Sequence, residues 1–500
     1  MSQLLQKLQT HAQQQPNEMA LYSAVQTLTY AQLQDQVDIH SAYLTACGCK
    51  RLALWQDNRV SWVLWQLAAM QANIVVIPIA HFFSTQQINS LLNTTVPDLV
   101  VCDQEQSILA AHYQQKGNPL GGARCYHRTE FTEPTDEIFS NTALITFTSG
   151  STAAPKGVKI SYDLIDKVCH SLHQVTAPLA ISQHHCLLPL AVMLENIAGI
   201  FVPLWAGKTV TLATSSAIGF SGSSNIDPQR FVAHLMAANP ESLIVTPELL
   251  KLLMFAKQQG APLAQLKFVA VGGAKVSSQL IQQAHALGLP VYEGYGLSEC
   301  GSVVCLNTPT ASKAGSVGKP LDHIKIKIAD DGEIWVAGAH MQGYLQSGTF
   351  SDEHLATGDL GHLDSEGFLH ITGRKKNVQI NSFGRNLSPE WIESEIGALP
   401  GAIRALIFAD GQPAVTALIQ RHPTCSDAEL TAQLTYLNQQ LPDYAHVKHW
   451  LSLTPEVIQQ AKLLTGNGRL RREACYRHFE AQLLMNPTAL NSNSQVSHVF

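Results

Sequence analysis

Short apolar runs alternate with segments of helical spacing from the N-terminus to about residue 300. Runs such as RLALW (51–55), DLVVC (98–102), SLIV (242–245) and KFVAV (267–271) have the length and composition of buried strands. Segments between them, such as PQRFVAHLMAAN (228–239), place apolar residues every three or four positions, as one face of a helix does. This alternation predicts an α/β fold with parallel sheet flanked by helices.

The pattern changes after about residue 320. HIKIKIADDGEIWVAG (323–338) and LGHLDSEGFLHITG (360–373) each predict two strands joined by a tight turn, which is typical of an antiparallel hairpin. A new pattern of strands and helices begins near Arg374. We therefore predict a large N-terminal domain (1–373) with parallel and antiparallel sheets and a small β-barrel segment. A small α+β domain (374–484) and a polar, flexible tail (485–500) follow.

Composition excludes several classes of protein. Hydrophobic residues make up 45% of the chain and charged residues 14%, so it is not mainly disordered. The net charge of −6 gives no general reason to bind nucleic acid. The most apolar stretch, 60–80, is interrupted by Gln66, Gln71 and Asn73, which argues against a membrane span. Because the ten cysteines are scattered, we expect a reducing, cytoplasmic setting without integral membrane association.

The segment ITFTSGSTAAPKGV (145–158) carries the first candidate chemistry. Hydroxyl residues and Gly150 directly follow a predicted strand, where N–H and O–H groups can converge on a polyphosphate. Lys156 adds a positive charge. The spacing is not that of a Walker A loop, and a plain Ser/Thr/Gly surface loop is the alternative for TSGST alone.

Two further segments add groups suited to a nucleotide. In VGGAKV (271–276), two glycines after a strand allow a flat ligand close to the backbone, and Tyr295 in VYEGYGLSEC (291–300) can stack on an aromatic base. The third segment, ATGDLGHLDSEGFLHITGRKKN (356–377), places Asp359 in a turn and Arg374 after the second hairpin.

In this order, the segments resemble those of the adenylate-forming superfamily, which includes acyl-CoA synthetases, firefly luciferase and the adenylation domains of peptide synthetases. The resemblance extends from LTYAQL (28–33) to GNGRLRR (466–472), with Ala153 at a position where the family has glycine. It implies ATP-dependent conversion of a carboxylic acid to acyl-AMP, with Mg²⁺ and release of pyrophosphate. Transfer to a thiol then follows rotation of a mobile C-terminal domain. CoA is the expected thiol, and the phosphopantetheine of an acyl carrier protein is the alternative.

The resemblance also implies roles for individual residues. The phosphates would be bound by Thr148, Ser149, Gly150, Ser151, Thr152 and Lys156, and the adenine by Gly273, Ala274, Tyr295 and Gly296. Ser298 would contact the α-phosphate, Glu299 would hold Mg²⁺, and Asp359 with Arg374 would hold the ribose. Lys376 stands at the interdomain hinge, and Gly384 would border the thiol tunnel.

The last motif departs from the family pattern. Where the family has a catalytic lysine, LLTGNGRLRRE (463–473) has Arg469, which keeps the positive charge but differs in reach and geometry. We interpret Arg469 as the catalytic cation. The alternatives are another basic residue, slow adenylation, or an adenylate-binding protein that has lost ligase activity.

The acid pocket is predicted from CLLPLAVMLENIAGIFVPLWAGKTVTL (186–212), which is strongly apolar. Val192 and Met193 are the expected wall residues, and Glu195 is the nearest acid. Because a buried ammonium needs a paired carboxylate, an apolar acid is favoured over an amino acid, and a medium- or long-chain fatty acid is the expected substrate. His184 and His185 just before this segment are interpreted as an exposed strand entry, since consecutive residues rarely converge on a metal.

Overall fold

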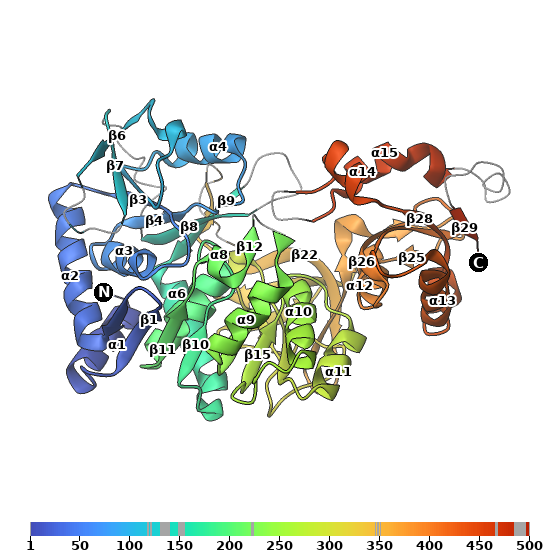
Figure 1. The fold of residues 1–500 in the computed structure, drawn as a ribbon, viewed down its shortest axis with the longest axis horizontal. Coiled ribbons are helices and arrows are strands. Elements are labelled where there is room, and N and C mark those ends of the chain that lie inside the picture. Colours follow the sequence, from blue (N-terminus) through green and yellow to red (C-terminus); the bar gives the residue numbers. More distant parts are fainter. Residues whose placement is uncertain are drawn as a thin grey trace.

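The computed structural model describes residues 2–117, 120, 123–130, 141–148, 156–221, 225–345, 347, 350, 352–465, 469–484 and 497–499. Mixed α/β architecture is confirmed: several sheets are flanked by helices, and one small sheet is curled. Figure 1 shows the elements up to β23 on one side and β26–β29 with α13–α15 on the other.

The first sheet has the strand order β21-β9-β8-β4-β3-β5-β7-β6. Its strands are β3 (Arg51–Trp55), β4 (Val75–Pro78), β5 (Leu99–Cys102), β6 (Tyr113–Lys116), β7 (Arg124–Arg128), β8 (Thr142–Thr148), β9 (Lys156–Ser161) and β21 (Gly343–Tyr344). The centre β8-β4-β3-β5 is parallel, as the apolar runs predicted, while β9 returns antiparallel to β8. Helices α2 (Tyr30–Ala46), α3 (Val60–Gln71) and α4 (Thr85–Thr95) connect or flank these strands.

The second sheet has the order β18-β17-β16-β15-β14-β10-β11-β1-β2. Its strands are β1 (Met19–Ser23), β2 (Thr27–Thr29), β10 (Gln183–His185), β11 (Thr209–Leu212), β14 (Ser242–Val245), β15 (Phe268–Val271), β16 (Val291–Tyr295), β17 (Cys305–Leu306) and β18 (Lys319–Pro320). The run from β11 to β16 is parallel, so the carboxyl ends of β14, β15 and β16 share one edge. Ligands of open α/β sheets bind at such an edge.

The remaining elements of the larger part complete its layers. The helices are α1 (Gln3–Gln14), α6 (Tyr162–Thr176), α7 (Val202–Trp205), α8 (Ser215–Ile218), α9 (Pro228–Ala238), α10 (Pro247–Gln258) and α11 (Ser278–Ala286), with a π-helix, η3, at Glu195–Phe201. The two predicted hairpins are confirmed as β19 (Ile324–Ile328) with β20 (Glu333–Gly338), and β22 (His354–Leu363) with β23 (Leu369–Arg374). Together they form the small curled sheet. A short hairpin joins β12 (Phe220–Ser221) to β13 (Asn225–Ile226).

Local sequence explains where the helices begin and what they bury. Thr29 and Gln32 form a capping box at the start of α2, and Asp227 followed by Pro228 starts α9. Helix α3 is apolar on all sides and accordingly buried, with Trp62 and Trp65 fully inside the core.

The C-terminal elements have hydrophobic clusters of their own. The sheet β26 (Ala402–Phe408), β27 (Val415–Arg421), β28 (Val447–Ser452) and β29 (Ser497–Val499) packs with α12 (Pro389–Gly397), α13 (Asp427–Asn438), α14 (Pro455–Gln460) and α15 (Arg472–Leu484). Within the segment predicted to be a flexible tail (485–500), Ser497–Val499 pairs antiparallel with β28. Backbone hydrogen bonds to a neighbouring strand can hold a segment in a sheet even where its side chains are polar.

Candidate active site

The predicted phosphate loop is framed by an antiparallel strand pair. Thr148 at the end of β8 lies opposite Lys156 at the start of β9. Ser149, Gly150, Ser151, Thr152 and Ala153 lie outside the described residues, and so does the side chain of Thr148. Lys156 is exposed, and its Nζ lies 5.2 Å from the centre of the Tyr344 ring. The strand pair therefore places the Lys156 ammonium beside Tyr344 on β21.

Tyr344 connects Lys156 to Glu299. The Tyr344 hydroxyl donates a hydrogen bond of 2.8 Å to Glu299 Oε1. Burial, and then the charge of Glu299, raise the pKa of Tyr344, so the phenol keeps its proton and remains a donor. Sequence reasoning missed Tyr344, because β21 has only two residues and is recognisable only by its pairing with β9.

Glu299 is half-buried in the short 3-10 helix η4 (Ser298–Cys300). Its carboxylate is suited to hold a magnesium ion. One carboxylate oxygen is held by Tyr344, and the other has no hydrogen-bond partner among the described residues. A fixed carboxylate with an available oxygen suits a hard divalent cation. Ser298, beside Glu299, is half-buried at the mouth of the cavity described below.

Asp359 lies at the centre of a polar group on β22. Its Oδ2 accepts a hydrogen bond of 2.7 Å from the Tyr295 hydroxyl, and its Oδ1 lies 2.8 Å from Nε of Arg374. Asp359 is 4% exposed. Each carboxylate oxygen has two lone pairs, so each can accept one further hydrogen bond from a ligand hydroxyl. Burial, and then Asp359, raise the pKa of Tyr295, which keeps its hydroxyl a donor.

Backbone at the carboxyl ends of β15 and β16 needs glycine for two different reasons. A Cβ on Gly296 would lie 1.7 Å from the carbonyl oxygen of Ser302, so no larger residue fits without moving backbone. Gly273 instead has a φ of +77° with open space around it. Ala274 beside it is exposed. Both segments border the same cavity mouth as Tyr295 and Ser298.

Arg469 reaches this edge from the C-terminal elements. Its guanidinium donates a hydrogen bond to the carbonyl oxygen of Gly273. Its backbone is held by Thr465, whose N–H donates to the Arg469 carbonyl at 2.7 Å. Burial, and then the charge of Arg374, lower the pKa of Arg469, yet an arginine stays charged at neutral pH. The structure thus brings Arg469, Gly273 and Arg374 together from segments far apart in the chain.

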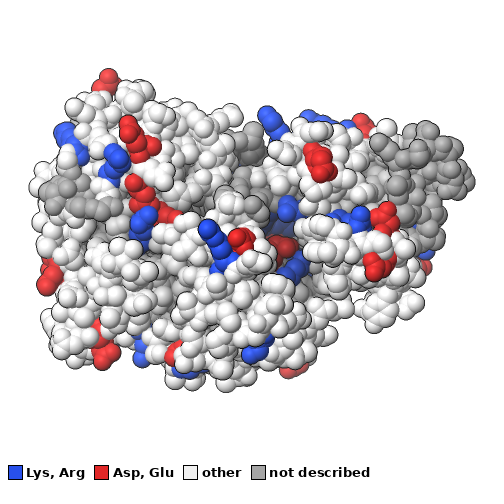
Figure 2. Space-filling view, in the orientation of Figure 1, with Lys and Arg blue, Asp and Glu red and all other residues white. Residues whose placement is uncertain are grey.

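The predicted hinge and thiol-tunnel residues follow β23. Lys376, in η5 (Lys375–Asn377), is exposed; partial burial, and then the charge of Arg374, lower its pKa. Its neighbour Lys375 forms ion pairs with Asp331 and Glu333 at 2.6 and 2.9 Å. Gly384 has a φ of +74° in an exposed turn between β24 (Gln379–Ile380) and β25 (Asn386–Leu387). Figure 2 shows basic and acidic side chains gathered in the hollow between the larger part and the C-terminal elements.

A mostly apolar cavity of about 630 Å³ opens at this edge of the second sheet. It extends beneath η3 and α6 along β14 and β15, and its lining includes Val192 and Met193, the predicted wall residues of the acid pocket. Its volume lies within the roughly 300–1,000 Å³ typical of small-molecule pockets.

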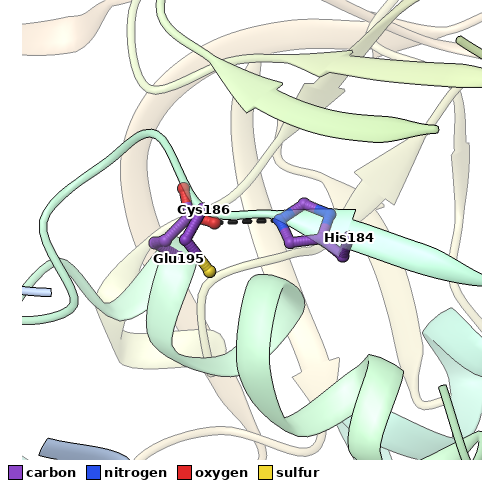
Figure 3. A group of neighbouring side chains, drawn as sticks. All are labelled: His184, Cys186 and Glu195. Atoms are coloured by element: carbon purple, nitrogen blue, oxygen red, sulfur yellow. Dashed lines mark hydrogen bonds and ion pairs between the residues drawn. The ribbon is translucent and has the colours of Figure 1, made fainter. Parts of the chain in front are cut away.

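Glu195 does not line the cavity, which corrects its predicted place in the acid pocket. Glu195 is completely buried; its Oε1 lies 2.9 Å from Nε2 of His184, and its Oε2 accepts the N–H of Leu188 at 2.9 Å. Figure 3 shows it on the helix facing His184 on the strand, with Cys186 nearby. The π-helix and Gly199 make room for it, since a Cβ on Gly199 would lie 2.1 Å from its Oε1.

The predicted exposure of the two histidines on β10 is also wrong. His184 and His185 are buried, and His184 Nδ1 lies 2.8 Å from Ser242 Oγ. The donor atoms of His184, Cys186 and Glu195 lie within 4.8 Å of one another. However, hydrogen bonds occupy both ring nitrogens of His184 and both oxygens of Glu195, and burial raises the pKa of Cys186 well above its usual value. We therefore interpret this group as a structural polar cluster.

A family model described as AMP-binding enzyme matches residues 8–345. The chain belongs to the AMP-binding enzyme family. The predicted resemblance to adenylate-forming enzymes of the acyl-CoA synthetase type is therefore confirmed.

Relatives of this AMP-binding enzyme include two kinds of CoA ligase. The 2-succinylbenzoate–CoA ligase of Staphylococcus epidermidis is 26% identical over 93% of this chain and 96% of its own. The long-chain-fatty-acid–CoA ligase FadD15 of Mycobacterium bovis is 36% identical, over 34% of this chain. That match covers only 30% of the mycobacterial ligase's length.

Solved structures share the fold of this AMP-binding enzyme. An O-succinylbenzoate coenzyme A synthetase of Bacillus subtilis in complex with AMP has a TM-score of 0.74 and 23% identity, over 93% of this chain and 97% of that chain. The anthranilate CoA ligase AuaEII in complex with anthranoyl-AMP has a TM-score of 0.77 and 16% identity, over 96% and 97% of the two chains. Within the described residues, the helices are too short or too polar to cross a membrane.

Proposed function

We propose that this AMP-binding enzyme is an acid–CoA ligase that forms acyl-AMP from a carboxylic acid and ATP and then transfers the acyl group to CoA. One observation carries the proposal. Lys156, Glu299, Asp359 and Arg469 come from segments far apart in the chain and border one edge of the second sheet. An apolar cavity opens at the same edge, beside Tyr295, Gly296 and Ser298.

In the first reaction, a carboxylate oxygen of the acid attacks the α-phosphorus of ATP, the bond to pyrophosphate breaks, and acyl-AMP forms. Lys156 and the loop between β8 and β9 hold the triphosphate, and Ser298 contacts the α-phosphate. Arg469 stabilises the negative charge that develops between the carboxylate and the phosphate. When bound at Glu299, Mg²⁺ supplies Lewis-acid stabilisation of the phosphate oxygens.

The nucleoside is held by groups that the protein already orients. Tyr295 and Arg374 fix the Asp359 carboxylate, whose remaining lone pairs accept the two ribose hydroxyls. Gly273, Ala274 and Gly296 let the adenine approach the backbone, and Tyr295 stacks on it. Because these groups are positioned before the ligand binds, little reorganisation is needed in the reaction.

In the second reaction, the thiol sulfur attacks the acyl carbonyl carbon, AMP leaves, and a thioester forms. The C-terminal domain (374–484) rotates about Lys376 for this step and brings the turn at Gly384 to the thiol. CoA is the proposed acceptor, because the relatives matched over most of their length are named CoA ligases. A carrier-protein phosphopantetheine is the alternative that the experiment below separates.

The apolar walls of the cavity favour a substrate acid with a large apolar body. We propose a medium- or long-chain acid of fatty-acid type. The names of the relatives add 2-succinylbenzoate and long-chain fatty acids to the acids worth testing.

The test measures pyrophosphate release with ATP and a panel of acids from acetate to octadecanoate, with benzoate and 2-succinylbenzoate. We expect release with an acid that has a large apolar body, and loss of release in Glu299→Gln. Glu353→Gln, which changes an exposed carboxylate, is the matched control and should keep the parent rate.

Each half of the proposal has its own contrary result. If no acid gives release above background, the chain binds adenylates without ligase activity. If acyl groups transfer to a purified carrier protein but not to CoA, the proposed acceptor is wrong and adenylation still stands.

A further inference from the structure

The acid cavity runs the length of the strands beneath it. It is lined near the nucleotide edge by Val271 and Gly272, at the carboxyl end of β15, and at the far end by Ser242 and Phe268, where β14 and β15 begin. A strand rises about 3.3 Å per residue, so the five steps from Phe268 to Gly273 span at most roughly 17 Å. An extended acid lying along this floor would carry its far end well away from the reacting carboxyl group.

The far end of the cavity is basic. His173, in the last turn of α6, and Lys208, just before β11, both line it there. His173 Nδ1 is buried and has no hydrogen-bond partner among the described residues. Lys208 is exposed. The cavity therefore changes from an apolar middle to two basic side chains at its far end.

Other basic groups lie near these two, and among the described residues no carboxylate is hydrogen-bonded or ion-paired to His173 or to the Lys208 ammonium. Glu241, just before β14, pairs with Lys267 instead, at 3.0 Å. Burial, and then the charges of Lys7, His170, Lys208 and His11, lower the pKa of His173. The acidic Asp166 on the same helix is already engaged: its carboxylate accepts hydrogen bonds from Ser2, Gln3 and Leu4 at the start of α1. The charge at this end of the cavity is therefore that of Lys208, which has no ion-pair partner among the described residues, and such a charge attracts an anion.

We propose that the acid activated by this enzyme carries a second carboxylate at its far end, and that Lys208 and His173 bind it. The inference rests on the proposed function, because it concerns the substrate of that reaction. The apolar middle of the cavity accommodates the methylene or aromatic body of such an acid. A plain fatty acid would place its methyl end beside the Lys208 ammonium and would gain no ion pair there.

The test compares matched pairs of acids in the pyrophosphate assay: octanoate with octanedioate, dodecanoate with dodecanedioate, and hexadecanoate with hexadecanedioate. The quantity is the ratio of kcat/KM for the diacid to kcat/KM for the monoacid at each length. We expect the ratio to favour the diacid by about fivefold at the best length, which is the size expected of a partly exposed ion pair.

Variants of Lys208 test whether this side chain binds the second carboxylate of the acid. Lys208→Met keeps the aliphatic stem and removes the charge, so the ratio should fall about fivefold. Lys208→Arg should keep the preference, and Lys208→Glu should reverse it. Because Lys208 is exposed, these changes leave the core intact. Lys50→Met changes another exposed lysine, next to β3 in the other sheet, and should leave the ratio unchanged.

Two results would overturn the inference, and they differ in what else they affect. If monoacids are preferred at every length and Lys208→Met leaves the ratio unchanged, the second carboxylate is excluded while the ligase activity stands. If neither kind of acid releases pyrophosphate, the proposed function fails and the inference fails with it.

Discussion

Two regions of the molecule are built in opposite ways. One is the proposed nucleotide edge, at the carboxyl ends of β15 and β16, with Lys156, Glu299, Asp359 and Arg469; the other is the proposed acid cavity. At the nucleotide edge, the side chains are polar and held by one or two partners: Lys156 is exposed, Glu299 is half-buried, and the buried Asp359 is held by Tyr295 and Arg374. Along the cavity, the surface is mainly apolar, and the Glu195 carboxylate behind it is buried, with one oxygen held by His184 and the other by Leu188. The difference shows which polar residues face a ligand and which serve the fold.

This comparison makes a general prediction about substitutions. A residue of the nucleotide edge should change activity with little effect on stability, because solvent or ligand can replace its partners. A residue of the buried cluster should change stability first, because its partners would be left in the core without hydrogen bonds. The following experiments test this separation.

The largest effect is expected for Glu195→Ala. It leaves the ring nitrogen of His184 and the N–H of Leu188 without partners in a buried site, and it opens a cavity beside Gly199. Each buried polar group left without its partner costs about 1–3 kcal/mol of unfolding free energy, and the new cavity adds to this loss. Chemical denaturation of the two proteins measures this loss directly.

Glu195→Gln is the matched control for that loss. Its amide can donate to His184 and accept from Leu188, so the cost should be only about 1 kcal/mol. If Glu195→Ala were as stable as the parent protein, the cluster would not be structural and the contrast between the two regions would fail.

Arg469→Ala should give the next largest effect, and on activity rather than stability. Loss of a cation that stabilises transition-state charge typically lowers the rate by about a hundredfold to a thousandfold. We expect a decrease of this size in acyl-AMP formation, partial recovery in Arg469→Lys, and an unchanged melting temperature.

The thioester half-reaction separates this role from a general defect. Preformed acyl-AMP added with CoA bypasses adenylation, so Arg469→Ala should convert it at close to the parent rate. Acyl-AMP formation at the parent rate in Arg469→Ala would instead show that another basic residue supplies the charge.

The residues that sequence alone grouped as a nucleotide site do lie together in the structure, whereas the surroundings of Glu195 and His184 were predicted wrongly, and the physical reason is local. Lys156, Glu299 and Asp359 stand in short segments next to strand ends, where the chain itself determines the geometry. The parallel strands and the two hairpins were predicted for the same reason, since period and turn residues are local signals.

The features that sequence missed depend on tertiary pairing. Tyr344 stands on a two-residue strand, and the exposure of His184 depends on Glu195 eleven positions later and on Ser242 from another strand. Ser497–Val499 pairs with β28 despite a polar neighbourhood. In each case the partner that decides the environment is distant along the chain, so no local pattern reveals it.

The smallest effect is expected for Tyr344→Phe, which tests the link between Lys156 and Glu299. Phenylalanine keeps the ring beside the Lys156 ammonium and removes only the hydroxyl that donates to Glu299 Oε1. Loss of one hydrogen bond to a half-buried carboxylate costs about 1 kcal/mol, or roughly a fivefold decrease in acyl-AMP formation.

A positioning role for Tyr344 makes a prediction that a purely structural role does not. Without the hydroxyl, the Glu299 carboxylate is less well oriented, so the Mg²⁺ concentration needed for half-maximal acyl-AMP formation should rise, while the melting temperature stays within a degree or two of the parent value. An unchanged Mg²⁺ dependence in Tyr344→Phe would mean that Glu299 is oriented without Tyr344. Because the ring remains in place, a change in Mg²⁺ dependence can be assigned to the lost hydroxyl rather than to a displaced Lys156.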